Sequence, residues 1–373
     1  MSSVSKKELE DALRAAVARQ SHKYQNYHAF HFRFEDDDTR ADRDGTTFAN
    51  LARILCFPTP QTYVIPKAHT TPSFEVINKI SAIISKASTA PGRSLVLIHY
   101  AGHGGASDSN ELILNSTSGK KIAASRLVSL LVDETVLPFD APLDIILIFD
   151  CCFSFLATRN PSPKSRIVEI LTAGDDRDPI AFSAGTQLSF TSKVLVEVRK
   201  RAQNGEKFIE VADLIDTLRK SSPVKTPSYA AKVGMGSITL PLAQIPITPS
   251  TSSMRRNPPG LLATFSLHVS KTFSRDELKE LVKWIGTFPK IKGASMKLEN
   301  VKQTSSMVFI FEASRLSYLR ICGLPGMILI CENEPADFSW LFAPEPAIQM
   351  PTRGGPLFPK PLKENQPFGK QQK

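Results

Sequence analysis

A histidine and a cysteine, each close to the end of an apolar run, are the residues of this sequence best suited to chemistry. His103 lies in the segment HYAGHGG, and Cys152 lies 49 residues later in the segment FDCCFS. A free cysteine has a pKa near 8.5, so only a few per cent of it is thiolate at neutral pH. A nearby imidazole can take the thiol proton or, as imidazolium, stabilise the thiolate. We therefore interpret His103 as a general base and Cys152 as a nucleophile.

The backbone beside these two residues supplies the hydrogen-bond donors that acyl transfer needs. Glycines on both sides of His103 allow close approach of the backbone and expose its N–H groups. The amides of Gly104 and Cys152 are therefore predicted to stabilise the oxyanion of an acyl-transfer intermediate. Cys151 points away from its neighbour along the strand and is assigned to the core. His99 lies inside an apolar run and is interpreted as a hydrogen-bonded core histidine.

Strands that alternate with amphipathic helices must position these residues. The alternation predicts an α/β fold with a mostly parallel, six-stranded sheet flanked by helices. Two almost wholly apolar runs, SLVLIHYA and LDIILIFD, are predicted to be central strands, and ligands bind beyond the carboxyl ends of such strands. The expected strands are His28–Phe34, Thr62–Ile65, Ser94–Ala101, Asp144–Asp150, Ala181–Ser183 and Gly236–Leu240. The expected helices are Gly45–Leu55, Ser73–Lys86, Ala123–Glu134, Thr191–Arg201 and Glu210–Leu218.

Composition divides the chain into five parts. A short N-terminal helix at residues 1–24 precedes the α/β domain at 25–244. A proline- and serine-rich linker at 245–260 leads to a small C-terminal α/β module at 261–345. The module is expected to contain three strands (LLATFSLHV, SMVFIFEA and GMILICE) and one helix (RDELKELVKWIGT). Residues 346–373 hold six prolines and five basic residues and are predicted to form a disordered basic tail.

The composition also excludes several classes of protein. No run approaches the ~18 apolar residues of a membrane helix, and the N-terminus lacks the apolar core of a signal peptide. Five cysteines without framework spacing favour a reducing compartment, the cytoplasm or the nucleus. The net charge of +10 includes +4 from the predicted tail and +2 from the predicted linker. Because zinc-finger and RNP motifs are also absent, we expect no nucleic-acid partner.

The order of the two motifs distinguishes among thiol chemistries. The histidine precedes the cysteine by 49 residues, close to the ~50 of caspases, whereas papain-like enzymes have the cysteine first. HYAGHG followed by a strand that ends in DCC resembles the caspase-like cysteine peptidase superfamily, in its metacaspase and fungal caspase-like branch. The animal caspase signature around the nucleophile, Q-A-C-[RQG]-G, is absent. The resemblance covers about residues 27–242.

The resemblance implies a cysteine endopeptidase with a caspase-like fold, a fungal source and a role in regulated cell death. His103 matches the general base and Cys152 the nucleophile, and the chemistry then requires no cofactor. Asp150 matches an acid of the S1 pocket, and Asp38 or Asp37 matches a second one. Two carboxylates in that pocket favour protein and peptide substrates with Arg or Lys at P1.

The same resemblance suggests self-processing and calcium activation. The basic segment that follows the nucleophile strand matches the loop at which caspase-like enzymes are cleaved. Lys164 and Arg166 are therefore the candidate self-cleavage sites. Many metacaspases are activated by Ca²⁺, so Ca²⁺ activation is expected here, but no acidic cluster has the EF-hand spacing that would identify ligands.

Two other classes of function compete with a peptidase. Metacaspases commonly continue DCC with His-Ser-Gly, whereas this chain has Phe153-Ser154-Phe155. Phe153 and Phe155 would close the pocket in a catalytically inactive scaffold, which would act on a protein partner through the C-terminal module. A basic nucleic-acid binder is the third alternative, and salt-dependent binding would reveal it.

Overall fold

A computed structural model describes most of the chain between residues 24 and 333. The described residues are 7, 24–138, 140–158, 166–175, 180–182, 185–222, 225–234, 236–244, 262–269, 273–286, 296–303, 307–322, 324 and 326–333. The predicted linker (245–260) and basic tail (346–373) lie outside them. Of the predicted N-terminal helix, only Lys7 and Tyr24 are described.

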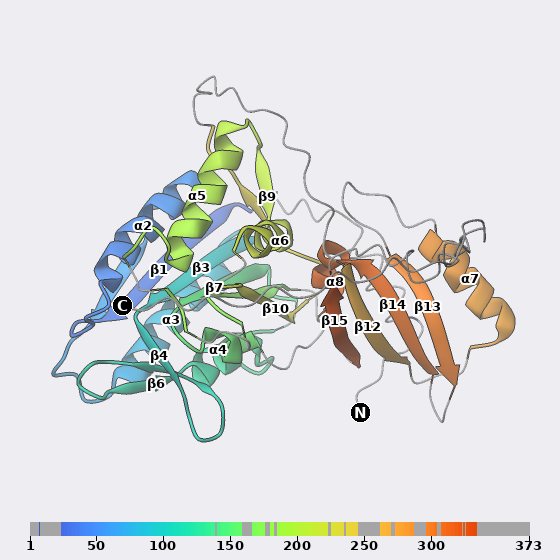
Figure 1. Ribbon diagram of the computed structural model, residues 1–373. Helices are drawn as coiled ribbons and strands as arrows, with labels where there is room; N and C mark the ends of the chain where they lie inside the picture. The colour runs from blue at the N-terminus through green and yellow to red at the C-terminus, as the bar shows by residue number, and fades with distance from the viewer. Residues whose placement is uncertain are drawn as a thin grey trace, which may run out of the picture. The chain divides into compact units, whose positions relative to one another are not determined.

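Six strands form one sheet, in the order β10-β8-β7-β3-β1-β2 (Figure 1). They are β1 (Asn26–Phe34), β2 (Gln61–Ile65), β3 (Ser94–Ala101), β7 (Leu143–Asp150), β8 (Val168–Thr172) and β10 (Ser228–Val233). All neighbours are parallel except β10, which is antiparallel to β8. Every residue of β3 and β7 is buried, because both faces of a central strand are covered. The prediction of a mostly parallel, six-stranded sheet is confirmed.

Helices cover both faces of this sheet. They are α2 (Ala41–Ile54), α3 (Pro72–Thr89), α4 (Ala124–Val132), α5 (Phe190–Gln203) and α6 (Val211–Ser221). Side chains along β3 alternate between two apolar clusters, as the period of a strand requires. Leu95 and Leu97 share a cluster with α2, α5 and α6, whereas Val96 and Ile98 share one with α3 and α4. The sheet therefore lies between two helical layers, as predicted.

The last two strands of the sheet differ from those expected from the sequence. Ala181 and Phe182 have irregular backbone, so the strand expected there is wrong for the residues that are described. The strand expected at Gly236–Leu240 is β11 (Thr239–Pro241), which pairs with β9 (Phe208–Glu210) outside the six-stranded sheet. β8 and β10 occupy the sheet instead. Each carries a buried charged residue that interrupts its apolar pattern, Glu169 in β8 and Lys232 in β10.

Short elements follow the two central strands. β4 (His103–Ala106), β5 (Leu112–Asn115) and β6 (Lys121–Ala123) form a three-stranded antiparallel sheet directly after β3. A 3-10 turn, η1 (Ser154–Thr158), follows β7. His103 is thus the first residue of β4, and Cys152 lies in the short segment between β7 and η1.

A second, smaller sheet follows in the C-terminal module, in the order β13-β14-β12-β15. The elements of the module are β12 (Leu262–Val269), α7 (Arg275–Gly286), β13 (Met296–Gln303), β14 (Met307–Ser314), α8 (Arg315–Ile321) and β15 (Met327–Asn333). Phe265, Phe309 and Phe311 lie at the centre of its core. The prediction of a small α/β module is confirmed, although β13 and α8 were not expected. Among the described residues, no helix has the length and apolar character that crossing a membrane requires.

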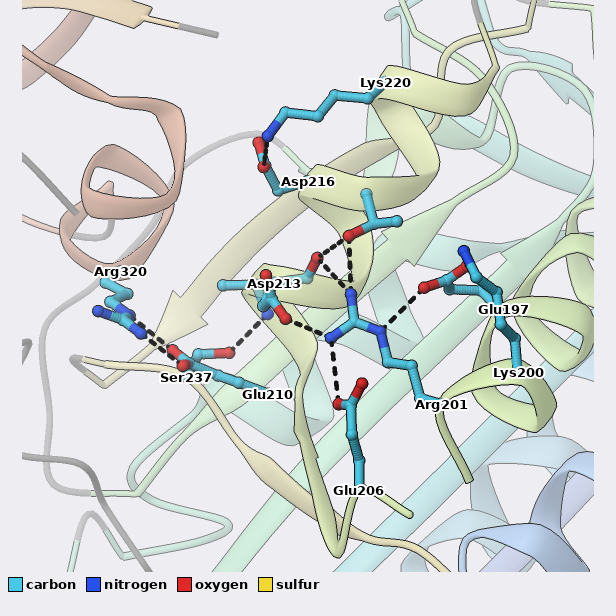
Figure 2. Close-up of polar contacts among 12 residues, drawn as sticks. Glu197, Lys200, Arg201, Glu206, Glu210, Asp213, Asp216, Lys220, Ser237 and Arg320 are labelled. Atoms are coloured by element: carbon cyan, nitrogen blue, oxygen red, sulfur yellow. Dashed lines mark hydrogen bonds and ion pairs between the residues drawn. The ribbon is translucent and has the colours of Figure 1, made fainter. Parts of the chain in front are cut away.

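Arginines of α8 form ion pairs with residues of β9 and α6. Arg320 binds Glu210 through two hydrogen bonds of 2.7 and 2.6 Å (Figure 2). Arg315, which is 1% exposed, donates to Asp216 Oδ1 at 2.7 Å and to its carbonyl oxygen at 2.9 Å. Bidentate arginine–carboxylate contacts are stronger and more directional than single ones. These contacts fix α8 against the α/β domain.

Candidate active site

The two sequence motifs meet at the carboxyl edge of the central strands. β3 and β7 are parallel neighbours, and Ala101 pairs with Asp150 at their ends. The backbone of Gly104 lies directly against the other motif: a Cβ at Gly104 would lie 2.1 Å from the carbonyl oxygen of Cys152 and 2.8 Å from Cys151 Sγ. The residue after the histidine therefore touches the cysteine pair.

His103 is held by three contacts, two to its backbone and one to its ring. Its backbone N–H donates to Asp37 Oδ2 at 3.3 Å, and its carbonyl oxygen accepts from Tyr100 Oη at 2.8 Å. Its Nε2 lies 2.5 Å from Asp38 Oδ1. No hydrogen bond joins the His103 ring to Cys152 among the described residues. The structure thus brings the two motifs into contact without a bond between base and nucleophile.

Asp37 and Asp38, expected in the S1 pocket, lie beside His103 in this structure. Asp37 Oδ1 accepts from the N–H and the hydroxyl of Thr39, at 2.9 and 2.6 Å, which closes a tight turn between β1 and α2. The hydrogen bond from His103 is the largest cause of the lowered pKa of Asp38. No hydrogen bond joins either acid to Asp150 in the described part of the chain.

Asp150 is buried at the end of β7, with 2% of its surface exposed. Its Oδ2 accepts from the N–H and the hydroxyl of Thr191, at 2.8 and 2.7 Å. Its Oδ1 has no hydrogen-bond partner among the described residues. Burial raises the pKa of this carboxyl group, because removal from water disfavours the charged form. Asp150 is therefore a buried acid with one oxygen that has no hydrogen-bond partner in the described part of the chain.

Asp44 is a second buried acid in this region, which the sequence analysis missed. It is fully buried in α2, and it accepts from Gly185 N–H at 2.6 Å and from Ser189 Oγ at 2.7 Å. Burial and then the charge of Asp150 raise its pKa to about 7. A signal was present: Asp44 shares the buried face of α2 with Ala41 and Phe48, at spacings of three and four residues.

A buried chain of hydrogen bonds runs from β1 to Asp150. His31 Nδ1 lies 2.9 Å from His99 Nδ1, and His99 Nε2 lies 2.9 Å from Thr191 Oγ1. Because the Thr191 hydroxyl donates its proton to Asp150, it can only accept from His99, so His99 carries its proton on Nε2. His99 Nδ1 must then accept from His31. Burial lowers the pKa of both histidines, to about 4 for His31.

The buried Asp44–Asp150 pair predicts a pH-dependent stability. The folded-state pKa of Asp44 lies near 7, above its unfolded value of about 3.9, so the folded state binds more protons between these pH values. This contribution to stability is present below pH ~4 and is lost as pH rises toward 8. Asp44→Asn should reduce the fall in melting temperature between pH 5 and pH 8 by about 5 °C. Asp108→Asn, a charge-matched change at an exposed position outside α2, should not alter it.

The segment after the nucleophile contains one strained residue. Cys151 is 2% exposed, and burial raises the pKa of its thiol, whereas Cys152 is partly exposed. Phe153 has φ = 56°, a left-handed conformation that is uncommon for a bulky residue. Ser154 Oγ accepts from Ala173 N–H at 3.1 Å, which ties this segment to the end of β8. The strain lies beside the candidate nucleophile, where such conformations are often found.

Of the two candidate self-cleavage sites, Arg166 lies within the described residues. Lys164 lies outside the described residues. Arg166 is fully buried and donates from Nη1 to the carbonyl oxygen of Leu137 at 3.1 Å. Cleavage after Arg166 therefore requires local unfolding of this segment. Among the described residues, no group of three or more His, Cys, Asp or Glu side chains is arranged to hold a metal ion.

Comparisons with known proteins do not assign the chain to a family. It matches no protein-family profile and no curated protein sequence. Among solved structures, it is similar to the crystal structure of caspase-1 from Spodoptera frugiperda, at 14% identity and a TM-score of 0.40, over 57% of this chain and 88% of that chain. The chain's own fold and site define an α/β protein with a histidine and a thiol at adjacent strand ends.

Proposed function

We propose that this protein is a caspase-like cysteine endopeptidase with Cys152 as the nucleophile and His103 as the general base. The close approach of Gly104 to the carbonyl oxygen of Cys152 and the side chain of Cys151 carries the proposal. It sets the backbone that follows His103 against the backbone of a partly exposed cysteine, and nucleophilic catalysis by cysteine needs an imidazole near the thiol. Following the sequence resemblance, we assign it a role in regulated cell death, in the cytoplasm or nucleus of a fungal cell.

The proposed reaction uses groups of the chain alone. His103 takes the thiol proton, and Cys152 Sγ attacks the scissile carbonyl carbon. The amides of Gly104 and Cys152 donate to the oxyanion that forms. The C–N bond then breaks, His103 gives its proton to the leaving amine, and a thioester remains on Cys152. Water hydrolyses the thioester, which releases the carboxylic acid product and the thiol.

The buried pair of Asp44 and Asp150 suits a basic P1 side chain. Burial drives both carboxyl groups toward the neutral form, and a guanidinium or ammonium group beside them favours the charged form again. Asp150 Oδ1 has no hydrogen-bond partner among the described residues, so it can accept from such a group. The charge of Lys193 already lowers the pKa of Asp150, as a substrate cation would. We therefore favour Asp44, with Asp150, as the S1 acids.

Peptides that differ only at P1 test this proposal. Arg and Lys peptides should be cleaved, and Asp peptides should not. Asp150→Asn should lower kcat/KM for the Arg peptide about thirtyfold, the loss of one charged hydrogen bond. The rate of Cys152 alkylation should stay unchanged. Asp108→Asn, at an exposed position, provides the charge-matched control. Equal cleavage of Asp peptides would contradict the assignment.

An inactive scaffold is the second candidate function, and two observations favour it. Asp44 and Asp150 have at most 2% of their surfaces exposed, and no hydrogen bond joins Cys152 to His103 in the described residues. A scaffold would act on a protein partner through the C-terminal module. Failure of both peptide cleavage and Cys152 alkylation, with and without Ca²⁺, would support it over the peptidase.

A further inference from the structure

We propose that Asp38 is a positioning residue for His103: it holds the imidazole in the orientation that proton transfer requires. The inference rests on the proposed function and assigns Asp38 a role other than the expected one in the S1 pocket. Its basis is the 2.5 Å contact between His103 Nε2 and Asp38 Oδ1. A base that is oriented by a third group is the general arrangement of nucleophilic active sites.

The contact fixes which ring nitrogen serves the thiol. The hydrogen bond from His103 lowers the pKa of Asp38, so its carboxylate is ionised near neutral pH and can only accept. His103 Nε2 must then carry a proton. In the neutral imidazole this leaves Nδ1 with the lone pair that accepts a proton. Nδ1 is therefore the nitrogen that would take the proton of Cys152.

The two neighbouring acids hold different parts of the histidine. Asp37 Oδ2 accepts from the backbone N–H of His103 at 3.3 Å, while Asp38 binds its ring. The hydrogen bonds of Asp37 to Thr39 fix the turn that presents Asp38. The loop after β1 thus fixes the positions of both the backbone and the ring of His103.

The groups that face His103 come from four elements. The loop after β1 contributes Asp37 and Asp38, together with the charge of Asp36, which acts on Asp38. β3 contributes the hydroxyl of Tyr100. The end of β7 contributes Cys151 and Cys152, which lie against the next residue, Gly104. β5 contributes the neutral Asn115, which pairs with His103 in the ladder.

The solvent exposure of His103 and Asp38 limits how much the loss of Asp38 should slow the reaction of Cys152. The side chains of His103 and Asp38 are 42% and 68% exposed, so water screens the attraction between them. Removal of one member of such a surface pair is expected to change the rate of Cys152 alkylation only a few-fold. It is not expected to cause the much larger losses that follow removal of a buried triad acid.

The pH dependence of Cys152 alkylation by iodoacetamide, followed by peptide mass mapping, tests the role of Asp38 without a peptide substrate. Asp38→Ala should slow alkylation about fivefold at pH 6.5, where formation of the thiolate depends on a correctly oriented imidazole. At pH 10 the thiolate forms without that help, so the rates should agree. Asp108→Asn is the charge-matched control, and Cys56, an exposed thiol, is the internal reference.

The outcomes separate this inference from the proposed function. Wild-type alkylation rates at pH 6.5 in Asp38→Ala would overturn the role of Asp38. So would a rise in KM for Arg peptides at constant kcat, which would make Asp38 a specificity acid. If the wild-type protein cleaves no peptide but Asp38→Ala still slows alkylation at pH 6.5, the peptidase fails and the positioning role stands.

Discussion

Replacement of Cys152 by alanine is expected to abolish peptide cleavage and to leave the fold unchanged. Loss of a nucleophile removes the covalent pathway, so the turnover of Arg and Lys peptides should fall by about 10³-fold or more. Cys152 is only partly buried, and changes at such positions alter stability by about 0.5 kcal/mol or less. Fluorogenic cleavage and thermal unfolding measure the two effects separately.

The adjacent cysteine provides a matched control. Cys151 is buried, and burial raises the pKa of its thiol, so it is a poor nucleophile. Cys151→Ala should keep most of the activity and lose about 1 kcal/mol of stability through the small cavity that it leaves. Loss of activity in Cys151→Ala with full activity in Cys152→Ala would reverse the assignment.

Self-cleavage provides a second readout of the same substitution. If the protein cleaves its own chain, mass mapping should find new termini in the wild type that are absent from Cys152→Ala. Lys164 is expected to be cleaved before Arg166, because Arg166 is fully buried in the folded protein. Identical fragments from both proteins would indicate a contaminating protease.

The sequence was sufficient to predict the four neighbouring strands from β7 to β2 but not the two strands, β8 and β10, on the other side of β7. β3 and β7 are buried on both faces, so their sequences are continuous apolar runs, which clearly indicate central strands. β8 is short and contains Glu169, whose burial is balanced by hydrogen bonds from Tyr229 Oη at 2.5 Å and Ile238 N–H at 3.3 Å. Such tertiary partners are not visible in a local pattern, which explains why this strand was missed.

The same distinction applies to the site. The contact between the histidine and cysteine motifs follows from two strand ends and one rule of parallel sheets, so sequence alone could predict it. The direction of Asp37 and Asp38 depends on a turn in which Asp37 accepts from Thr39. The spacing of these residues allows such a turn, but it does not show that the turn lies beside His103. Asp44 was missed because it lies in a helix, away from the motifs, although it interrupts the apolar face of α2.

Gly104→Ala is expected to disrupt the candidate active site more than any other single-methyl change described here. The new Cβ would lie 2.1 Å from the carbonyl oxygen of Cys152, far inside any normal contact, and that oxygen belongs to the backbone. Either the β3–β4 junction or the Cys152 segment must therefore move. The separation of the two motifs should lower kcat/KM about 100-fold, since small misplacements have effects of this size. Overpacking should reduce stability by about 2 kcal/mol.

Gly105→Ala is the matched control for Gly104→Ala, because it shows whether this segment tolerates alanine where the backbone clash is absent. A Cβ at Gly105 would meet only the Nδ2 atom of Asn115, at 2.9 Å, and that side-chain end can rotate away. Gly105→Ala should therefore keep both the activity and the melting temperature close to those of the wild type. If Gly104→Ala and Gly105→Ala behave alike in both measurements, close contact between the histidine and cysteine motifs is not what the site requires. A loss confined to Gly104→Ala would mean that contact between the two backbones is essential to activity.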